Sequence, residues 1–191
     1  MREEWLILLH PNNFKLESTT VWSFPDRGSW ATHSGEYRGN WSPYVPRNLI
    51  LRYSNPGEWI LDQFMGSGTT LVEAKLLRRN AVGIDINPQA VSISARNLQF
   101  QCQSNSKIFM RNGSATELHF IKDNHIDFIC THPPYANIIK YSKGIEGDVS
   151  LLGVDEFLAE MKKVAKESFR VLKKGKICAI MIGDIRKHGK V

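Results

Sequence analysis

The stretch IDFICTHPPY at residues 126–135 ends in two prolines and a tyrosine, directly after a short apolar run. Proline has no N–H and pushes the residue before it out of helical geometry, so the backbone from His132 through Pro133 to Pro134 is held extended. Its carbonyl groups then point in fixed directions, and the flat ring of Tyr135 follows. A fixed acceptor, a polar side chain and a stacking ring suit a planar base with an exocyclic amine. Prolines after a strand are also common in turns, and the motif by itself favours that simpler interpretation.

A second chemical signal is the glycine-rich turn in ILDQFMGSGTTLVEA at residues 60–74. Gly66 and Gly68 allow a tight turn and a close approach of a ligand to the backbone. No lysine follows Gly68, which argues against a phosphate-binding P-loop. The dinucleotide fingerprint would have a third glycine where this chain has Leu71, which weakens a nicotinamide cofactor without excluding it.

Two aspartates stand at the ends of apolar runs that read as strands, Asp62 before the glycine turn and Asp85 in the next run. S-adenosylmethionine is a third candidate cofactor, because it carries a cationic sulfonium and an ammonium group that a carboxylate attracts. Asp62 would suit that cation, and Asp85 would suit the two ribose hydroxyls. Aspartates at such positions are also common turn caps.

The elements that must position these residues alternate between strand and helix patterns. Strands are predicted at 59–62, 81–85, 107–111, 126–131 and 177–183, and helices at 69–80, 87–100 and 155–172, with a turn at 174–176. The last helix is strongly amphipathic, with a predicted buried face of Phe157, Leu158, Met161, Val164, Ala165, Phe169 and Leu172. Residues 11–48 look irregular and rich in aromatics. This alternation predicts an α/β fold, with a mainly parallel sheet and helices on both faces.

Composition places few limits on function. The 191 residues suffice for one domain, and 42% hydrophobic with 23% charged residues is typical of a globular protein. The apolar runs are too short to cross a bilayer, so no membrane segment or signal peptide is expected. Three widely spaced cysteines predict a reduced, cytoplasmic protein without a metal site. The net charge of +6, partly from lysines at 173–176 and the run at 186–190, favours nucleic acid as a partner. Charge alone is equally compatible with no special partner.

Taken in order, these segments resemble the motifs of the DNA amino-methyltransferases. LDQFMGSGTT resembles their cofactor motif, GIDINPQAV their second-strand motif, and THPPY their catalytic Asp/Asn/Ser-Pro-Pro-Tyr/Phe motif. The segment at 41–62 is similar to one that closes over the methionine end of the cofactor, and RVLKKGKICAIMIGD to the helix-turn-strand after the catalytic loop. The resemblance extends from about residue 20 to the C-terminus.

The resemblance implies a Rossmann-like class I methyltransferase fold in a single domain of residues 1–191, with an aromatic-rich segment at 1–48 and a catalytic core at 49–191. It implies S-adenosylmethionine as cofactor and DNA as partner, with RNA as the alternative. The family sheet has seven strands and five are predicted here, so we expect the last two strands to be missing from this sequence. The residues implied to bind the cofactor are Asp62, Phe64, Gly66, Ser67, Gly68, Thr69, Asp85 at the ribose, Ile86 against the adenine and Ser114 near its amine. Those implied to hold the target base are His132, Pro133, Pro134 and Tyr135.

The sequence departs from the family pattern at two positions. Gln63 replaces the usual proline after Asp62, a mild change in backbone stiffness. His132 replaces Asp, Asn or Ser, whose side chain accepts a hydrogen bond from the target amine. Neutral histidine can accept such a bond and protonated histidine cannot, so activity should fall below the ordinary histidine pKa of about 6.5. Thr131 before it is similar to the form found in cytosine-N4 enzymes, which favours cytosine over adenine-N6.

Other interpretations stay open. A base flipped from its stack onto Tyr135 would also suit an RNA guanosine-N2 methyltransferase. A nucleic-acid-binding module that lost activity at His132 is a further alternative, and a nicotinamide-dependent oxidoreductase is less favoured. Arg27, Arg38 and Arg47 either cover the cofactor or touch nucleic acid. The N-terminal tryptophans are interpreted as a hydrophobic cap on the sheet, and His33, His119 and His125 as surface or loop residues.

Overall fold

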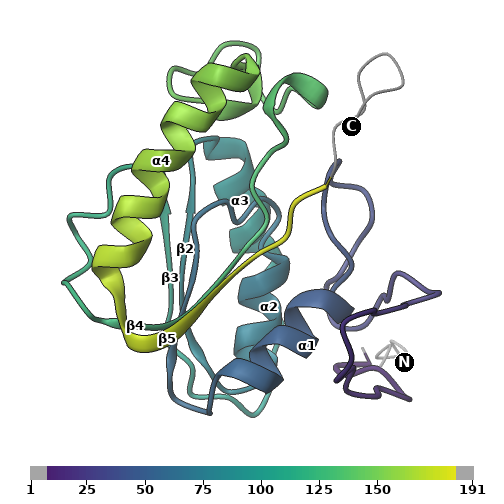
Figure 1. The fold of residues 1–191 in the computed structure, drawn as a ribbon. Helices are drawn as coiled ribbons and strands as arrows, with labels where there is room; N and C mark the ends of the chain where they lie inside the picture. The colour runs from purple at the N-terminus through teal and green to yellow at the C-terminus, as the bar shows by residue number, and fades with distance from the viewer. Residues whose placement is uncertain (1–7, 184–191) are drawn as a thin grey trace.

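Five parallel strands lie at the centre of residues 8–183, the part of the chain described by this computed structural model (Figure 1). They are β1 (Trp59–Asp62), β2 (Asn80–Asp85), β3 (Ile108–Asn112), β4 (Ile126–Thr131) and β5 (Leu172–Ile180). Their spatial order is β3-β2-β1-β4-β5, which confirms the predicted parallel α/β sheet. The strand order switches at β1, because β2 and β3 are added on one side of it and β4 and β5 on the other. Ligands bind outside the carboxyl ends of the strands at such a switch point.

The register brings the predicted chemical residues to one edge of the sheet. Asp62 of β1 pairs with Gly83, and Asp85 of β2 pairs with Asn112 of β3. On the other side of β1, Leu61 pairs with Ile129 of β4. The carboxyl ends of β1, β2 and β4 therefore meet at the same edge.

Helices cover both faces of this sheet. In Figure 1, α1 (Tyr44–Tyr53), α2 (Thr69–Leu76) and α3 (Pro88–Asn97) lie on one side and α4 (Val154–Val171) on the other. Short 3₁₀ turns, η1 (Ala136–Ile138) and η2 (Val149–Leu151), precede α4. The helix α3 begins as predicted, because the Asn87 side chain accepts a hydrogen bond from Gln89 N and Pro88 occupies the first helical position. Among residues 8–183, no helix is long and apolar enough to span a bilayer.

Two segments differ from the expected pattern. The helix α1 lies partly within the stretch predicted to be irregular, and its Pro46 is tolerated because it falls in the first turn. The predicted turn at 174–176 is instead a bulge inside β5. The pairing moves from Ile126 with Leu172 to Phe128 with Ile177, and Gly175 has φ +75°. The positive φ is a conformation that glycine adopts without steric cost, so the strand continues past it.

The predicted buried face of α4 was partly wrong. Phe157, Val164, Ser168 and Val171 are buried, whereas Leu158 is 59% and Phe169 87% exposed. Phe169 lies about 120° around the helix from Phe157, given 3.6 residues per turn. The stripe that faces the sheet is therefore narrower than the apolar pattern indicated.

A buried ionic network fixes the N-terminal segment of residues 8–43 to α2. The carboxylate of Glu73, which is fully buried, accepts hydrogen bonds from Trp30 Nε1 at 2.7 Å and from the Arg47 guanidinium at 2.8 Å. His33 Nε2 lies 2.8 Å from the same carboxylate. His33 therefore lies in a loop, which agrees with its prediction as a surface or loop residue, but the side chain is buried rather than at the surface.

Candidate active site

A cavity lies at the carboxyl edge of the sheet, where the glycine loop, the end of β2 and the proline elbow meet. Eight of the predicted site residues line it: Phe64, Gly66, Ser67, Asp85, Ile86, Ser114, His132 and Pro134. Five others lie outside the set of lining residues: Asp62, Gly68, Thr69, Pro133 and Tyr135. The fold therefore gathers both predicted motifs around one space.

Asp62 lies beneath the glycine loop and connects it to β4. Its Oδ1 accepts hydrogen bonds from Phe64 N at 3.1 Å and from the Thr131 hydroxyl at 2.8 Å. Burial raises the pKa of Asp62 to about 6, because the charged form is poorly solvated there. Since Thr131 directly precedes His132, this bond holds the two motifs together.

Two glycines shape the loop above Asp62. Gly66 has φ +51°, and its N–H donates to Asp85 Oδ2 at 2.9 Å. Gly68 has φ +84° and directly precedes α2, where a Cβ would collide with the side chain of Ser94. The positive φ favours glycine at both positions, and at Gly68 the collision with Ser94 adds a steric reason. The backbone approaches the end of β2 closely enough for a ligand to bridge the loop and the Asp85 carboxylate.

Asp85 keeps free acceptor capacity in this arrangement. Each of its oxygens accepts one backbone N–H, Oδ2 from Gly66 and Oδ1 from Asn87, the latter at 2.9 Å. A carboxylate has about four lone-pair sites, so further donors such as hydroxyls can still bind. Burial raises the pKa of Asp85 from its ordinary value.

Thr69 and Ser67 each use a polar group for a hydrogen bond within the protein. The Thr69 hydroxyl donates to Asn40 Oδ1 at 2.5 Å, and so holds the N-terminal segment against α2. The Ser67 carbonyl accepts a bond from Asn97 Nδ2 at 2.8 Å, while its residue lines the cavity. On the far side, the Ser114 hydroxyl lies 2.8 Å from Thr116 Oγ1.

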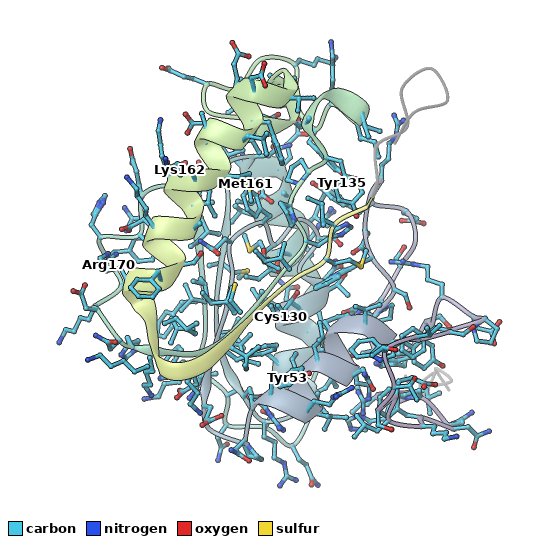
Figure 2. All side chains as sticks on the ribbon, viewed as in Figure 1. Tyr53, Cys130, Tyr135, Met161, Lys162 and Arg170 are labelled. Atoms are coloured by element: carbon cyan, nitrogen blue, oxygen red, sulfur yellow. The ribbon has the colours of Figure 1, made fainter. Side chains whose placement is uncertain are left out.

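The proline elbow presents a histidine held on two sides. The imidazole of His132 stacks on the indole of Trp41, and its Nε2 lies 2.5 Å from the Tyr135 hydroxyl. Burial lowers the pKa of His132 to about 4, so the ring is neutral at pH 7. In Figure 2, Tyr135 lies beyond Cys130 toward the carboxyl edge of the sheet. Ala136 follows with φ +41°, a strained conformation of the kind found at functional sites.

The contact between His132 and Tyr135 has two proton arrangements. In one, the phenol donates to Nε2 and the ring proton lies on Nδ1. In the other, Nε2–H donates to the phenol oxygen and Nδ1 is left as an acceptor. The second arrangement lets neutral His132 accept a hydrogen bond from a ligand while Tyr135 orients the ring.

Residues from two loops complete the cavity, and sequence reasoning did not single them out as site residues. Tyr37 and Trp41 come from the N-terminal segment, and Tyr141 and Asp148 from the loop after the elbow. The rings of Tyr37 and Tyr141 stack with centroids 6.4 Å apart. The aromatic-rich composition of residues 11–48 was the available signal, but it did not show which rings face the cavity.

The charge of the cavity restricts its ligand. Asp85 and Asp148 line it and Asp62 lies beneath it, whereas none of the described lining residues is Lys or Arg. A site without cations is poorly suited to a phosphate-bearing cofactor and well suited to a cationic one. The residues present therefore fit a ligand that carries sulfonium and ammonium charge.

The basic residues singled out in the sequence mostly have structural partners. Lys173 donates to Asp127 at 2.7 Å and Lys176 to Glu58 at 2.6 Å. The guanidinium of Arg27 donates to the carbonyl groups of Ser34 and Asn40, which shapes the N-terminal segment. The basic run at 186–190 lies outside the described residues.

Two family models match the chain. The model described as RMKL-like, methyltransferase domain, matches residues 50–181, and the model described as DNA methylase matches residues 3–96. These matches confirm the resemblance drawn from the sequence motifs.

Individual relatives match over part of their length. The Type II methyltransferase M.BglI of Bacillus subtilis is 33% identical over 111 residues, 54% of this chain and 32% of that protein. The tRNA (guanine(10)-N2)-dimethyltransferase of Methanothermobacter thermautotrophicus is 33% identical over 101 residues, 52% of this chain and 29% of that protein. Thus the matched part of this chain spans less than a third of either relative.

The fold is shared with solved structures. TrmN from Thermus thermophilus superposes with a TM-score of 0.58 at 20% identity, over 76% of this chain and 39% of that one. At this identity, the likeness concerns the fold.

Proposed function

The chain belongs to the methyltransferase family whose model covers residues 50–181, and on this premise we propose that it methylates the exocyclic amine of a DNA base with S-adenosylmethionine. Cytosine-N4 is the favoured target and adenine-N6 the alternative. One observation carries the proposal: His132 and Pro134 of the elbow line the same cavity as Gly66 and Asp85 of the cofactor motifs.

The cofactor half of the cavity would be formed by the glycine loop and the end of β2. Asp85 has acceptor capacity for ribose hydroxyls, and the backbone at Gly66 permits close approach. Phe64 and Ile86 are apolar residues for the adenine ring, and Ser114 offers a hydroxyl near it. When bound, S-adenosylmethionine supplies an electrophilic methyl group on its sulfonium.

The base half would be formed by the elbow. The Pro133 carbonyl and neutral His132 would accept hydrogen bonds from the two hydrogens of the amine. These bonds hold the nitrogen so that its lone pair points toward the methyl group, and positioning of this kind can supply much of the rate. Tyr135 would orient His132 through the hydroxyl contact, in addition to the stacking role expected from the sequence.

The state of Cys130 supports amine rather than ring-carbon methylation. Carbon-5 methylation of cytosine requires a thiolate nucleophile. Cys130 is fully buried in β4, and burial raises the pKa of its thiol well above the ordinary value. A buried neutral thiol on a strand cannot attack a base, so direct transfer to nitrogen is the better fit.

Guanosine-N2 in RNA is a second candidate. The tRNA (guanine(10)-N2)-dimethyltransferase matches this chain at the same identity, 33%, as the DNA methyltransferase M.BglI. Guanine-N2 is also an exocyclic amine, so the same carbonyl and imidazole acceptors would serve.

The test is transfer of a labelled methyl group to duplex DNA, single-stranded DNA and tRNA, followed by digestion to nucleosides. We expect N4-methylcytosine or N6-methyladenine from DNA. N2-methylguanosine from tRNA would support the second candidate instead. Binding of S-adenosylhomocysteine without transfer to any substrate would support a non-catalytic module. Failure to bind S-adenosylhomocysteine would contradict the proposal.

Two variants make this assay specific to the cavity. His132→Ala should abolish most transfer, because it removes the second acceptor. His125→Ala is the control, since His125 is exposed and lies outside the lining residues.

A further inference from the structure

Gln63 brings a buried amide to the wall of the active-site cavity. It directly follows β1, is only 1% exposed, and lines the cavity. Its Oε1 lies 2.9 Å from the Ser168 hydroxyl of α4, while Nε2 is buried with no hydrogen-bond partner among the described residues. This is the position at which the sequence departs from the usual proline of the cofactor motif.

The Ser168 hydroxyl cannot satisfy the amide completely. Its oxygen lies 2.9 Å from Gln63 Oε1 and 2.8 Å from the carbonyl oxygen of Val164, but a hydroxyl has a single proton to donate. If the proton goes to Gln63, Nε2 is left without an acceptor. If it goes to Val164, the amide turns to donate to Ser168 and its carbonyl oxygen is left without a donor. In both orientations, one polar atom of the amide has no protein partner.

An unpaired buried amide destabilises the unliganded fold, because it gives up hydrogen bonds to water and receives none in return. Phe64, Val149 and Val164 line the same cavity with apolar side chains, and no described protein group pairs with Gln63 Nε2. Proline or an apolar side chain at position 63 would avoid this cost. The amide is therefore better explained by a ligand that enters the cavity than by the stability of the protein alone.

We propose that Gln63 binds the edge of a base in which a ring nitrogen lies next to an exocyclic amine. This inference rests on the proposed function, which supplies two bases with such an edge: the adenine of S-adenosylmethionine and a cytosine or adenine target. A carboxamide presents an N–H donor and a carbonyl acceptor side by side. Glutamine pairs with adenine in this way in nucleic-acid recognition. The hydrogen bond with Ser168 fixes the plane of the amide. If the amide oxygen faces Ser168, its second lone pair stays free, and if the amide nitrogen faces Ser168, its second hydrogen stays free.

The decisive variant is Gln63→Met, which keeps the length of the side chain and removes its polar atoms. We expect the unliganded variant to unfold at the same or a higher temperature than the wild type. We also expect a loss of ligand recognition, by about tenfold in affinity or in base preference. A residue with only a structural role would not give a binding loss together with unchanged or increased stability.

Ser94→Ala is the matched control. The Ser94 hydroxyl is also buried without a partner, but Ser94 lies on α3 and outside the cavity-lining residues. Its removal should leave both affinity and base preference unchanged. Gln63→Leu serves as a second apolar variant should methionine prevent folding.

Two measurements distinguish the possible bases. Calorimetric titration with S-adenosylhomocysteine reports on the adenine of the cofactor. Competition between cytosine-containing and adenine-containing oligonucleotides for methylation reports on the target base. A fall in the affinity for S-adenosylhomocysteine places the cofactor's adenine at Gln63. A change in the preference between the two oligonucleotides, with that affinity unchanged, places the target base there.

Either result supports the proposal. Unchanged affinity together with unchanged base preference in the apolar variants would overturn it, as would binding losses of the same size in Ser94→Ala. A wild-type protein that fails to bind S-adenosylhomocysteine would contradict the proposed function itself, and that result is separable from the others.

Discussion

The indole of Trp41 stacks on the imidazole of His132, with ring centroids 5.3 Å apart and planes inclined by 25°. Trp41 lies just before α1 and is 6% exposed, whereas His132 follows β4 at the carboxyl edge of the sheet. Trp41 also packs in the core with Phe128 and Cys130 of that strand. The indole is thus a fixed surface that sets the plane of the imidazole.

Replacing this surface should impair catalysis more than cofactor binding. We expect Trp41→Leu to lower the rate of methyl transfer by about tenfold to hundredfold, because His132 would lose its fixed orientation. The smaller side chain should also reduce the free energy of unfolding by about 1–3 kcal/mol. Steady-state kinetics and urea unfolding measure the two effects.

Trp22→Leu is the control for Trp41, since Trp22 is only half-buried and lies outside the cavity-lining residues. It should leave the rate of transfer unchanged. An equal loss of rate in both variants would show that the Trp41 effect is not specific to the stack with His132.

The pH dependence of methyl transfer should follow the lowered pKa of His132. Burial lowers this pKa to about 4, so the ring stays a neutral acceptor well below the ordinary histidine value of about 6.5. The acidic fall in activity assigned to His132 is therefore expected near pH 4–5. A fall in activity near pH 4–5 therefore replaces the fall near pH 6.5 that an unperturbed histidine would give.

The lowered pKa of His132 also makes the free energy of unfolding depend on pH. The folded state prefers neutral His132, so its contribution is fully present above about pH 6.5 and is lost as the pH falls through about 4. Titration of the His132 ring protons by NMR measures the pKa directly. A midpoint near 6.5 would contradict the assignment.

Glu73 should contribute far more to stability than a surface carboxylate. Its ion pair with Arg47 is buried, with side-chain exposures of 0% and 8%. Glu73→Gln leaves the guanidinium without its counter-charge, and we expect a loss of about 3–5 kcal/mol in the free energy of unfolding. Hydrogen exchange should also accelerate in residues 8–43, which this network fixes to α2.

Glu160→Gln provides the comparison, because Glu160 pairs with Lys163 on the solvent-exposed side of α4. A surface pair of this kind contributes about 0–1 kcal/mol. Similar losses in the two variants would show that burial of the Glu73 network has no special effect.

Alanine at Gly68 should damage both the fold and the cavity, and the chain contains a matched control. Gly57 and Gly68 both have φ +84°, but a Cβ at Gly57 meets open space and one at Gly68 meets Ser94. Gly57→Ala should cost about 1–2 kcal/mol from backbone strain alone. Gly68→Ala adds about 1–3 kcal/mol of overpacking and should weaken the binding of S-adenosylhomocysteine. Equal effects in urea unfolding and calorimetry would refute the steric argument.

Much of the architecture followed from local patterns in the chain. The strands at 59–62 and 126–131 have the predicted bounds, and α3 begins at the predicted cap of Asn87 and Pro88. These features depend on apolar runs, proline geometry and capping, all of which act between neighbouring residues. The exposed Phe169 and the bulge at Gly175 did not follow, because they depend on how α4 and β5 dock onto the sheet.

The sequence by itself determined which chemical groups stand at the ends of the strands: Asp62, Asp85 and the His132 elbow. It could do so because the ends of strands are marked by local features, such as the glycine turn after Asp62 and the two prolines after His132. Only the tertiary structure decided which of these groups line the cavity. It placed Asp62 beneath the loop, turned Tyr135 toward His132, and set Trp41 and Gln63 against the cavity. Such contacts join distant segments through the order of the strands and the rotation of side chains, and no local periodicity encodes either.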